Sequence, residues 1–272
     1  MAMTTPGGPL EASPTNELTP TPTPTPAPAP TSSTPLLTRD EVVAQFGARK
    51  PVEWDLHVSG TVNRGSASAI AQGFVALTFD ACGGKGGNGY DAALIATLRQ
   101  LKVPATLMLN AHWITENLAI AQDLGADPLF EIQSHGFRHL PLSVSGKKAY
   151  GSTGTLTVGE VYDELVAGNA TIESISHRPV RFFRPGTAYC DEVAAAIAVA
   201  IGTPVVDFSV NGDAGTTFTA AQIDQEVGKV KPGDIVISHM NHPEHATAAG
   251  YARVLPRLVD RGTRFAHLTQ MA

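Results

Sequence analysis

The sequence predicts an α/β fold in which parallel strands, joined by helices, close into a barrel. From residue 74 onward, seven short apolar runs alternate with segments of helical spacing, a pattern typical of parallel strands with helical crossovers. About 235 residues lie beyond a proline-rich N-terminus, a length that suits one barrel. Polar residues follow the apolar runs, and such barrels carry their active sites at these strand ends. A doubly wound open sheet is the alternative architecture.

The first 36 residues form no part of this predicted barrel. Between Pro20 and Pro30, prolines alternate with Thr and Ala. Because proline fixes φ and lacks an amide donor, this segment can join neither a helix nor a sheet. We therefore predict a disordered Thr/Pro-rich linker over residues 1–36, followed over residues 37–73 by a segment that packs on the barrel. Thr38 and Glu41 form a capping-box pattern that predicts a short first helix in that segment.

Residues 74–272 are predicted to form the barrel, with strands and helices in alternation. Short apolar runs predict the strands, and apolar residues spaced three or four apart predict the helices. The predicted strands are 74–79, 105–109, 130–134, 181–184, 205–210, 235–238 and 265–268. The predicted helices are 91–102, 113–124, 157–176, 191–201, 220–230 and 247–260.

Composition and charge limit the binding partners and the cellular location that we expect for this protein. The chain has 25 acidic and 19 basic residues, a net charge of -6 and no basic run, so nucleic acid is not an expected partner. The apolar run over residues 194–201 is too short to cross a bilayer. A Thr/Pro-rich linker is typical of exported, envelope-attached proteins, although no signal peptide is visible. We expect a secreted or envelope-attached monomer.

Residues able to carry chemistry follow five of the predicted strands. In chain order they are Asp80, His135, His139, Arg184, Asp213 and His239. Two imidazoles four residues apart suit a metal ion, and an arginine can keep a neighbouring carboxylate ionised as a base. Each residue alone also fits a structural role, as a turn cap, an ion-pair partner or a core histidine. Together they indicate a metal-assisted hydrolytic site.

Five motifs in this order, ALTFD, SHGFRH, FRPG, NGD and IVISH, resemble those of the polysaccharide deacetylases of carbohydrate esterase family 4. The resemblance runs from about residue 74 to the C-terminus and implies a distorted (β/α)7 barrel, in agreement with the strand count. It also implies a divalent-metal-dependent hydrolase, most often with zinc. Such an enzyme removes N-acetyl or O-acetyl groups from a polysaccharide or oligosaccharide.

The resemblance implies catalytic roles as well. Asp80 would deprotonate the attacking water, and Arg184 would orient Asp80. His239 would protonate the leaving group. The backbone amide of Thr187, next to Pro185, would bind the developing oxyanion.

The resemblance also implies a further residue that would adjust the pKa of the acid, His239. Asp213 is the best candidate, with Asn211 and Asp207 as alternatives. Small residues follow Asp213 where the family often has an aromatic residue of the acetyl pocket. This departure leaves the shape of that pocket open.

His135 and His139 would hold the metal, but the family's second aspartate, its third metal ligand, is Ala81 here. A methyl group cannot coordinate a metal, and catalytic zinc usually has three protein ligands. We expect Asp80 to be the third ligand, with Cys82 or Asp213 as alternatives. The rival interpretation is an envelope glycan-binding protein whose metal site has decayed and whose catalysis is weak or absent. A hydrolase of small amides is a third candidate.

Two further features remain open in the sequence. Cys82 and Cys190 lie just beyond predicted strand ends and are either a disulfide or two unpaired residues. His242 and His245 follow the last motif, where a solvated loop is expected rather than an extension of the metal site.

Overall fold

The structure, a computed structural model, describes residues 1–4 and 37–272. Its centre is a sheet in the order β3-β2-β1-β7-β6, with β8 beside β1, and all of these pairings are parallel. The strands are β1 Phe74–Ala81, β2 Ala105–Leu109, β3 Phe130–Ser134, β6 Val210–Asn211, β7 Ile235–His239 and β8 Arg264–Phe265. Nearly all of the linker predicted over residues 1–36 lies outside the described residues.

Isolated bridges extend this sheet and close it into a barrel. Ser134, at the end of β3, pairs with Phe183, and Phe183 pairs in turn with Val205. The segment that begins at Val205 continues into β6, which pairs with β7, and β7 returns to β1. The predicted α/β barrel is therefore confirmed.

Three of the predicted strands are much shorter than expected, and of residues 265–268 only residue 265 lies in a strand. Of residues 181–184 and 205–210, only single bridges and the two-residue β6 take part in pairing. The reason is that side chains occupy the backbone groups that a ladder would use. The amides of residues 181 and 182 donate to the Gln133 side chain, and the carbonyls of residues 206 and 207 accept from Arg184. These side-chain bonds distort the barrel on the side that carries Arg184.

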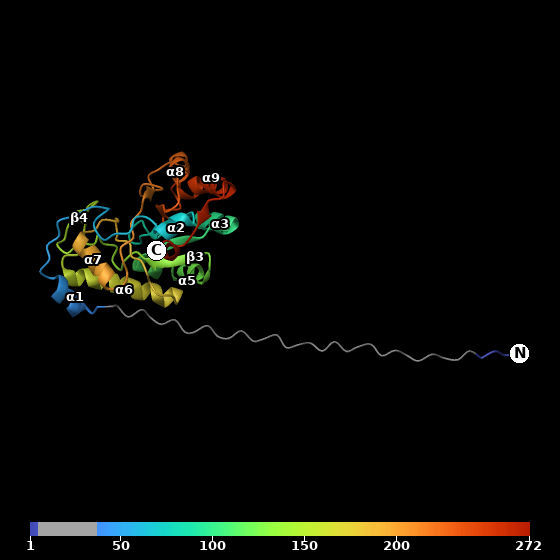
Figure 1. The fold of residues 1–272 in the computed structure, drawn as a ribbon, viewed down its shortest axis with the longest axis horizontal. Coiled ribbons are helices and arrows are strands. Elements are labelled where there is room, and N and C mark those ends of the chain that lie inside the picture. Colours follow the sequence, from blue (N-terminus) through green and yellow to red (C-terminus); the bar gives the residue numbers. More distant parts are fainter. Residues whose placement is uncertain (5–36) are drawn as a thin grey trace.

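Helices cover the outside of the barrel (Figure 1). α3, α8 and α9 lie together on one side, and α1, α6 and α7 on another. The predicted helix over residues 113–124 is split in two, because the Asn117 side chain bonds the carbonyls of Asn88 and Trp113 and competes with helical bonding. The helices are α1 Arg39–Phe46, α2 Ala67–Ala71, α3 Ala92–Leu101, α4 Ala111–Glu116, α5 Leu118–Ala126, α6 Val158–Ser176, α7 Glu192–Ala200, α8 Ala220–Val227 and α9 Thr247–Asp260.

The segment before β1 lies against the barrel. The predicted capping box of Thr38 and Glu41 is confirmed and begins α1, whose buried Val42 and Phe46 join the core beneath α6 and α7. Further along, residue 55 bridges to Cys190 and residue 62 to residue 206. These bridges carry the intervening residues to the end of the barrel where the candidate site lies.

The side chains of β1 divide between two environments. Seven of its eight residues are buried, as expected for a parallel strand covered by helices. Val75, Leu77, Phe79 and Ala81 belong to the core cluster formed with the covering helices. Because successive side chains of a strand point to opposite faces, Asp80 points to the barrel interior.

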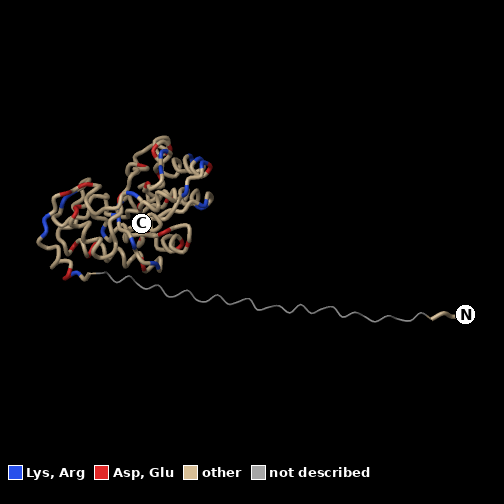
Figure 2. Tube along the Cα trace, viewed as in Figure 1, with Lys and Arg blue, Asp and Glu red and all other residues tan. Residues whose placement is uncertain are grey.

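Outside the central sheet, the described chain has one hairpin and a surface of mixed charge. The hairpin of β4 (Lys148–Ala149) and β5 (Ser152–Thr153) is antiparallel and turns at Tyr150. Acidic and basic residues are interspersed over the described chain, with no block of one sign (Figure 2). In the described part of the chain, no helix combines the length and hydrophobicity needed to cross a membrane.

Candidate active site

A buried ion pair lies at the centre of the site. Arg184 is fully buried, and its Nη1 donates to Oδ1 of Asp80 over 2.7 Å and to the hydroxyl of Thr78 over 2.7 Å. Burial by itself would raise the pKa of Asp80. The charge of Arg184 and its hydrogen bond to the carboxylate oppose burial, and this pKa is lowered. Asp80 is therefore ionised at neutral pH and held in one orientation.

His239 lies next to Asp80 because β7 pairs with β1 in a register that places residue 239 beside residue 80. Asp213 binds His239 twice, accepting from its backbone amide over 2.8 Å and from ring Nδ1 over 3.0 Å. Thr247 also donates to this buried carboxylate. Burial would lower the pKa of His239, but the hydrogen bond and charge of Asp213 raise it.

Of the three candidates to tune His239, the structure places only Asp213 in contact with the imidazole ring. Asn211 instead accepts from the amide of Ala214. Asp207 bonds to His57 on the far side of Arg184.

His135 and His139 converge beside Asp80. Their Nε2 atoms are 3.1 Å apart, and Nε2 of His135 is 3.7 Å from Oδ2 of Asp80. Nδ1 of His135 donates to the carbonyl of Arg184 over 2.9 Å, so its Nε2 carries the lone pair. Burial lowers the pKa of His135, and burial together with the charge of His135 lowers the pKa of His139 to about 3. Both rings are neutral, as metal ligands must be.

The residues present fit a metal ion. The Cys82 Sγ atom is 3.7 Å from His135 Nε2, and the donor atoms of Cys82, His135 and His139 all lie within 4.8 Å of one another. Two imidazoles and a thiol are a donor set that zinc accepts. Cys82 and Cys190 are both free cysteines, so the two do not form a disulfide.

A strained turn follows Arg184. Thr187 has φ of 71° and Ala188 has φ of 61°, which is an uncommon conformation for residues with a side chain. Within the described chain, neither the Thr187 amide nor its buried hydroxyl has a hydrogen-bond partner. Pro185 is buried before this turn, and a Cβ on Gly186 would collide with the His139 carbonyl. The turn therefore presents a free amide donor beside the metal-ligand candidates.

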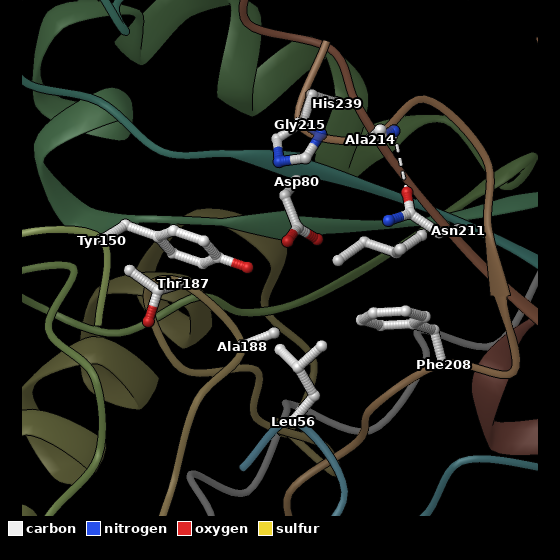
Figure 3. Close-up of a pocket in the computed structure, with 11 residues that line it drawn as sticks. Leu56, Asp80, Tyr150, Thr187, Ala188, Phe208, Asn211, Ala214, Gly215 and His239 are labelled. Carbon is white, nitrogen blue, oxygen red and sulfur yellow. Dashed lines mark hydrogen bonds between the residues drawn. The ribbon is translucent and has the colours of Figure 1, made fainter. Parts of the chain in front are cut away.

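Asp80 and His239 line a pocket of about 480 Å³ (Figure 3). In Figure 3 the Asp80 carboxylate points into the pocket between the rings of Tyr150 and Phe208. The remaining lining residues are Leu56, Thr187, Ala188, Asn211, Ala214, Gly215 and Ile237. Local sequence patterns do not predict Leu56, Tyr150 and Phe208 as pocket residues, because they come from segments that are distant in the chain.

Another group of donors lies outside this site. His242, Glu244 and His245 approach one another in the partly exposed loop after β7. Glu244 contacts both imidazoles at the surface, so nothing buried in the described chain marks this group as a ligand site.

Comparisons with known proteins find a matching family model and several relatives. The family model described as "Polysaccharide deacetylase" matches residues 69–206, just over half of the chain. A bifunctional xylanase/xylan deacetylase of Cellvibrio japonicus is 25% identical over 175 residues, which cover 61% of this chain and 23% of that protein. The chain spans between about a quarter and a half of the curated relatives that it matches.

Two solved structures share the fold. The first is a pseudoenzyme of carbohydrate esterase family 4 from Bacillus anthracis, with 22% identity, a TM-score of 0.63, and coverage of 83% of this chain and 70% of that one. The second is a family 4 acetyl xylan esterase from Clostridium thermocellum in complex with a cobalt ion. It has 22% identity, a TM-score of 0.59, and coverage of 73% and 89%.

Proposed function

Because the chain belongs to the polysaccharide deacetylase family, we propose that it is a metal-dependent hydrolase that removes acetyl groups from a polysaccharide. One observation carries this proposal: a carboxylate held by an arginine and a histidine held by an aspartate meet at one pocket, next to two converging imidazoles. A base, an acid and metal ligands are the groups that such a hydrolysis needs.

In this mechanism, Asp80 takes the proton of the attacking water. Arg184 occupies Oδ1 of Asp80, so Oδ2 is the oxygen that accepts this proton. His239 is protonated through its contact with Asp213 and donates a proton to the departing nitrogen or oxygen. The two groups therefore begin the reaction in opposite protonation states, as an acid and a base must.

The turn after Arg184 binds the oxyanion. Thr187 lines the pocket and its amide has no hydrogen-bond partner in the described chain, so the amide needs to break no bond before donating to the developing negative charge. A well-placed donor of this kind contributes about 3–4 kcal/mol to transition-state stabilisation. Pro185 limits the backbone freedom of the turn and helps to hold the amide in place.

His135 and His139 are the residues that would hold the metal, and zinc is the ion that we propose, since imidazoles are among its usual ligands. When bound, the ion supplies a Lewis acid that polarises the acetyl carbonyl and lowers the pKa of water.

The surroundings of the pocket support a polymeric substrate. Tyr150 is 78% exposed at the pocket, its ring is 5.6 Å from that of Tyr189, and Tyr189 is 5.7 Å from Trp54. A row of partly exposed rings leading away from a pocket offers faces on which successive sugar rings can stack. The N-terminal sequence is rich in Thr and Pro, which is typical of exported proteins. We therefore propose that the enzyme is secreted or attached to the cell envelope.

Tyr150→Ala tests this role of the aromatic row. Since an aromatic contact is worth about 0.5–1.5 kcal/mol, KM for an acetylated oligosaccharide should rise roughly 2–10-fold. Hydrolysis of a small acetyl ester, which cannot reach Tyr189 or Trp54, should stay unchanged. Equal losses on both substrates would show that Tyr150 shapes the pocket and does not bind a chain of sugars.

Asp213→Asn tests the assignment of the acid through the pH dependence of kcat/KM. His239 must be protonated to act, so activity falls as pH rises through its pKa. Asp213 holds that pKa above the ordinary value, and its neutral replacement should move the alkaline limb to lower pH by about one unit or more. Thr247→Val removes a neighbouring bond to Asp213 but keeps the charge, so its alkaline limb should not move. An unmoved limb in Asp213→Asn would rule out His239 as the acid.

The function itself is tested by elemental analysis of the purified chain and by acetate release from chitooligosaccharides, peptidoglycan and acetylated xylan. We expect bound zinc, acetate from at least one substrate, loss of activity with a chelator, and recovery with a divalent ion. Ala81 and the similarity to a pseudoenzyme favour the rival function, a glycan-binding protein. Glycan binding without metal or acetate release would establish that function instead.

A further inference from the structure

The third metal ligand is the open question of this site, because the position at which the family resemblance places an aspartate is Ala81. The side chain of Ala81 packs in the core with Leu77 and Phe79. Position 81 therefore belongs to the face of β1 that points away from the site. By the alternation of a strand, the next side chain on the side of Asp80 belongs to Cys82.

We propose that Cys82 binds the metal as a thiolate and completes a ligand set with His135 and His139. This proposal rests on the proposed function and replaces Asp80, the third ligand expected from the sequence. It assigns a cysteine to a role that the family pattern gives to a carboxylate.

The spacing of the donor atoms carries the proposal. Ligands at the usual distances from zinc, about 2.0–2.3 Å, lie about 3.3–3.6 Å from one another. Here Nε2 of His135 is 3.1 Å from Nε2 of His139 and 3.7 Å from Sγ of Cys82. The lone pair of His135 Nε2 thus faces two other donor atoms at once, at separations that suit ligands of one cation.

The loop after Cys82 fixes its position. Gly83 and Gly84 have φ of 74° and 78°, and a Cβ on Gly83 would meet the amide of Trp113. The amide of Gly83 donates to the carbonyl of Gly87 over 3.1 Å, and the amide of Gly87 donates back to Gly84 over 3.0 Å. Glycine is therefore required for the chain to turn tightly and leave Cys82 directed at the imidazoles.

Asp80 is the weaker candidate for the third ligand. Its Oδ1 is bonded to Arg184. Although its Oδ2 is 3.7 Å from His135, Asp80 does not belong to the described group whose donors all lie within 4.8 Å of one another. A thiolate ligand leaves Asp80 free to act as the base. Binding releases the thiol proton to solvent, so the charge that enters with the ion is partly neutralised by the new thiolate.

Cobalt(II) gives a direct readout, since a cobalt–thiolate bond produces an intense near-ultraviolet charge-transfer band that imidazoles and carboxylates do not. The full chain, reduced and stripped of metal, is titrated with cobalt(II) and then competed with zinc. We expect the band to grow to one equivalent in the unaltered chain and in Cys190→Ala, the matched control at the other free cysteine. Cys82→Ala should lose the band. Loss of a group that only orients a ligand costs roughly 10–100-fold in metal affinity, so loss of this ligand should cost about 100-fold or more.

Cys82→Asp distinguishes a lost ligand from a disturbed loop. It should bind cobalt(II) with an affinity between those of the unaltered chain and Cys82→Ala, without the charge-transfer band. Stoichiometric cobalt without the band in the unaltered chain, or equal affinity in Cys82→Ala, would overturn the assignment of Cys82 while the proposed function stands if acetate is still released. The band without acetate release from any substrate would sustain the ligand and overturn the deacetylase.

Discussion

Asp80→Asn is expected to reduce acetate release by about 10²–10⁴-fold, the usual contribution of a general base. Asparagine has nearly the same shape as aspartate and still offers an oxygen to Nη1 of Arg184, but it cannot take a proton from water. The loss should appear in kcat, because the substrate contacts of the pocket wall are unchanged. Acetate release under saturating substrate measures this effect directly.

Two controls separate chemistry from folding in this experiment. Asp123→Asn changes an exposed carboxylate that pairs with Arg99 on the outer helices, so it should leave kcat unchanged. The cobalt(II) affinity of Asp80→Asn should stay close to that of the unaltered chain, since the proposed ligands are Cys82 and the two imidazoles. If Asp80→Asn retains more than about a third of the unaltered rate, its general-base role is wrong, because that role requires at least about 10²-fold.

The barrel could be predicted from the sequence, and so could the meeting of six candidate residues at one end of it. Parallel strands place their carboxyl ends at one edge, so residues following different strands meet even when 159 positions separate Asp80 from His239 in the chain. The rule does not give the pairing of β1 with β7 or its register, which sets these two residues side by side. Asp213 was also the best sequence candidate for the partner of His239.

The remaining features depend on contacts that local patterns do not encode. The shortened strands around residues 183 and 205 result from hydrogen bonds that the side chains of Gln133 and Arg184 make to backbone groups 48 and 23 positions away. The pocket wall combines Leu56 from the segment before the barrel with Tyr150 from a hairpin. The choice among Asp80, Cys82 and Asp213 as third ligand required distances, because all three follow strand ends and each offers a donor atom.

Arg184→Met is expected to cost about 3–5 kcal/mol in the free energy of unfolding, because it leaves a buried carboxylate without its partner. The guanidinium also donates to Thr78 and to the carbonyls of residues 206 and 207. Since native domains have only about 5–15 kcal/mol in total, this loss should be visible as a much lower urea midpoint. Arg184→Met/Asp80→Asn should lose less than the single variant, because no unpaired charge remains.

The pH dependence of this loss identifies its cause. In the unaltered chain the pKa of Asp80 is below its ordinary value of 3.8. The stability from the ionised pair is therefore fully present above pH 3.8 and is lost as pH falls through the lower, folded-state pKa. In Arg184→Met, burial is no longer opposed by the guanidinium, so this pKa should rise and protonation should remove the unpaired charge as pH falls. Urea unfolding at decreasing pH should show the two proteins converging in stability. A constant difference between them would mean that Arg184 acts through packing and its backbone hydrogen bonds, not through the charge of Asp80.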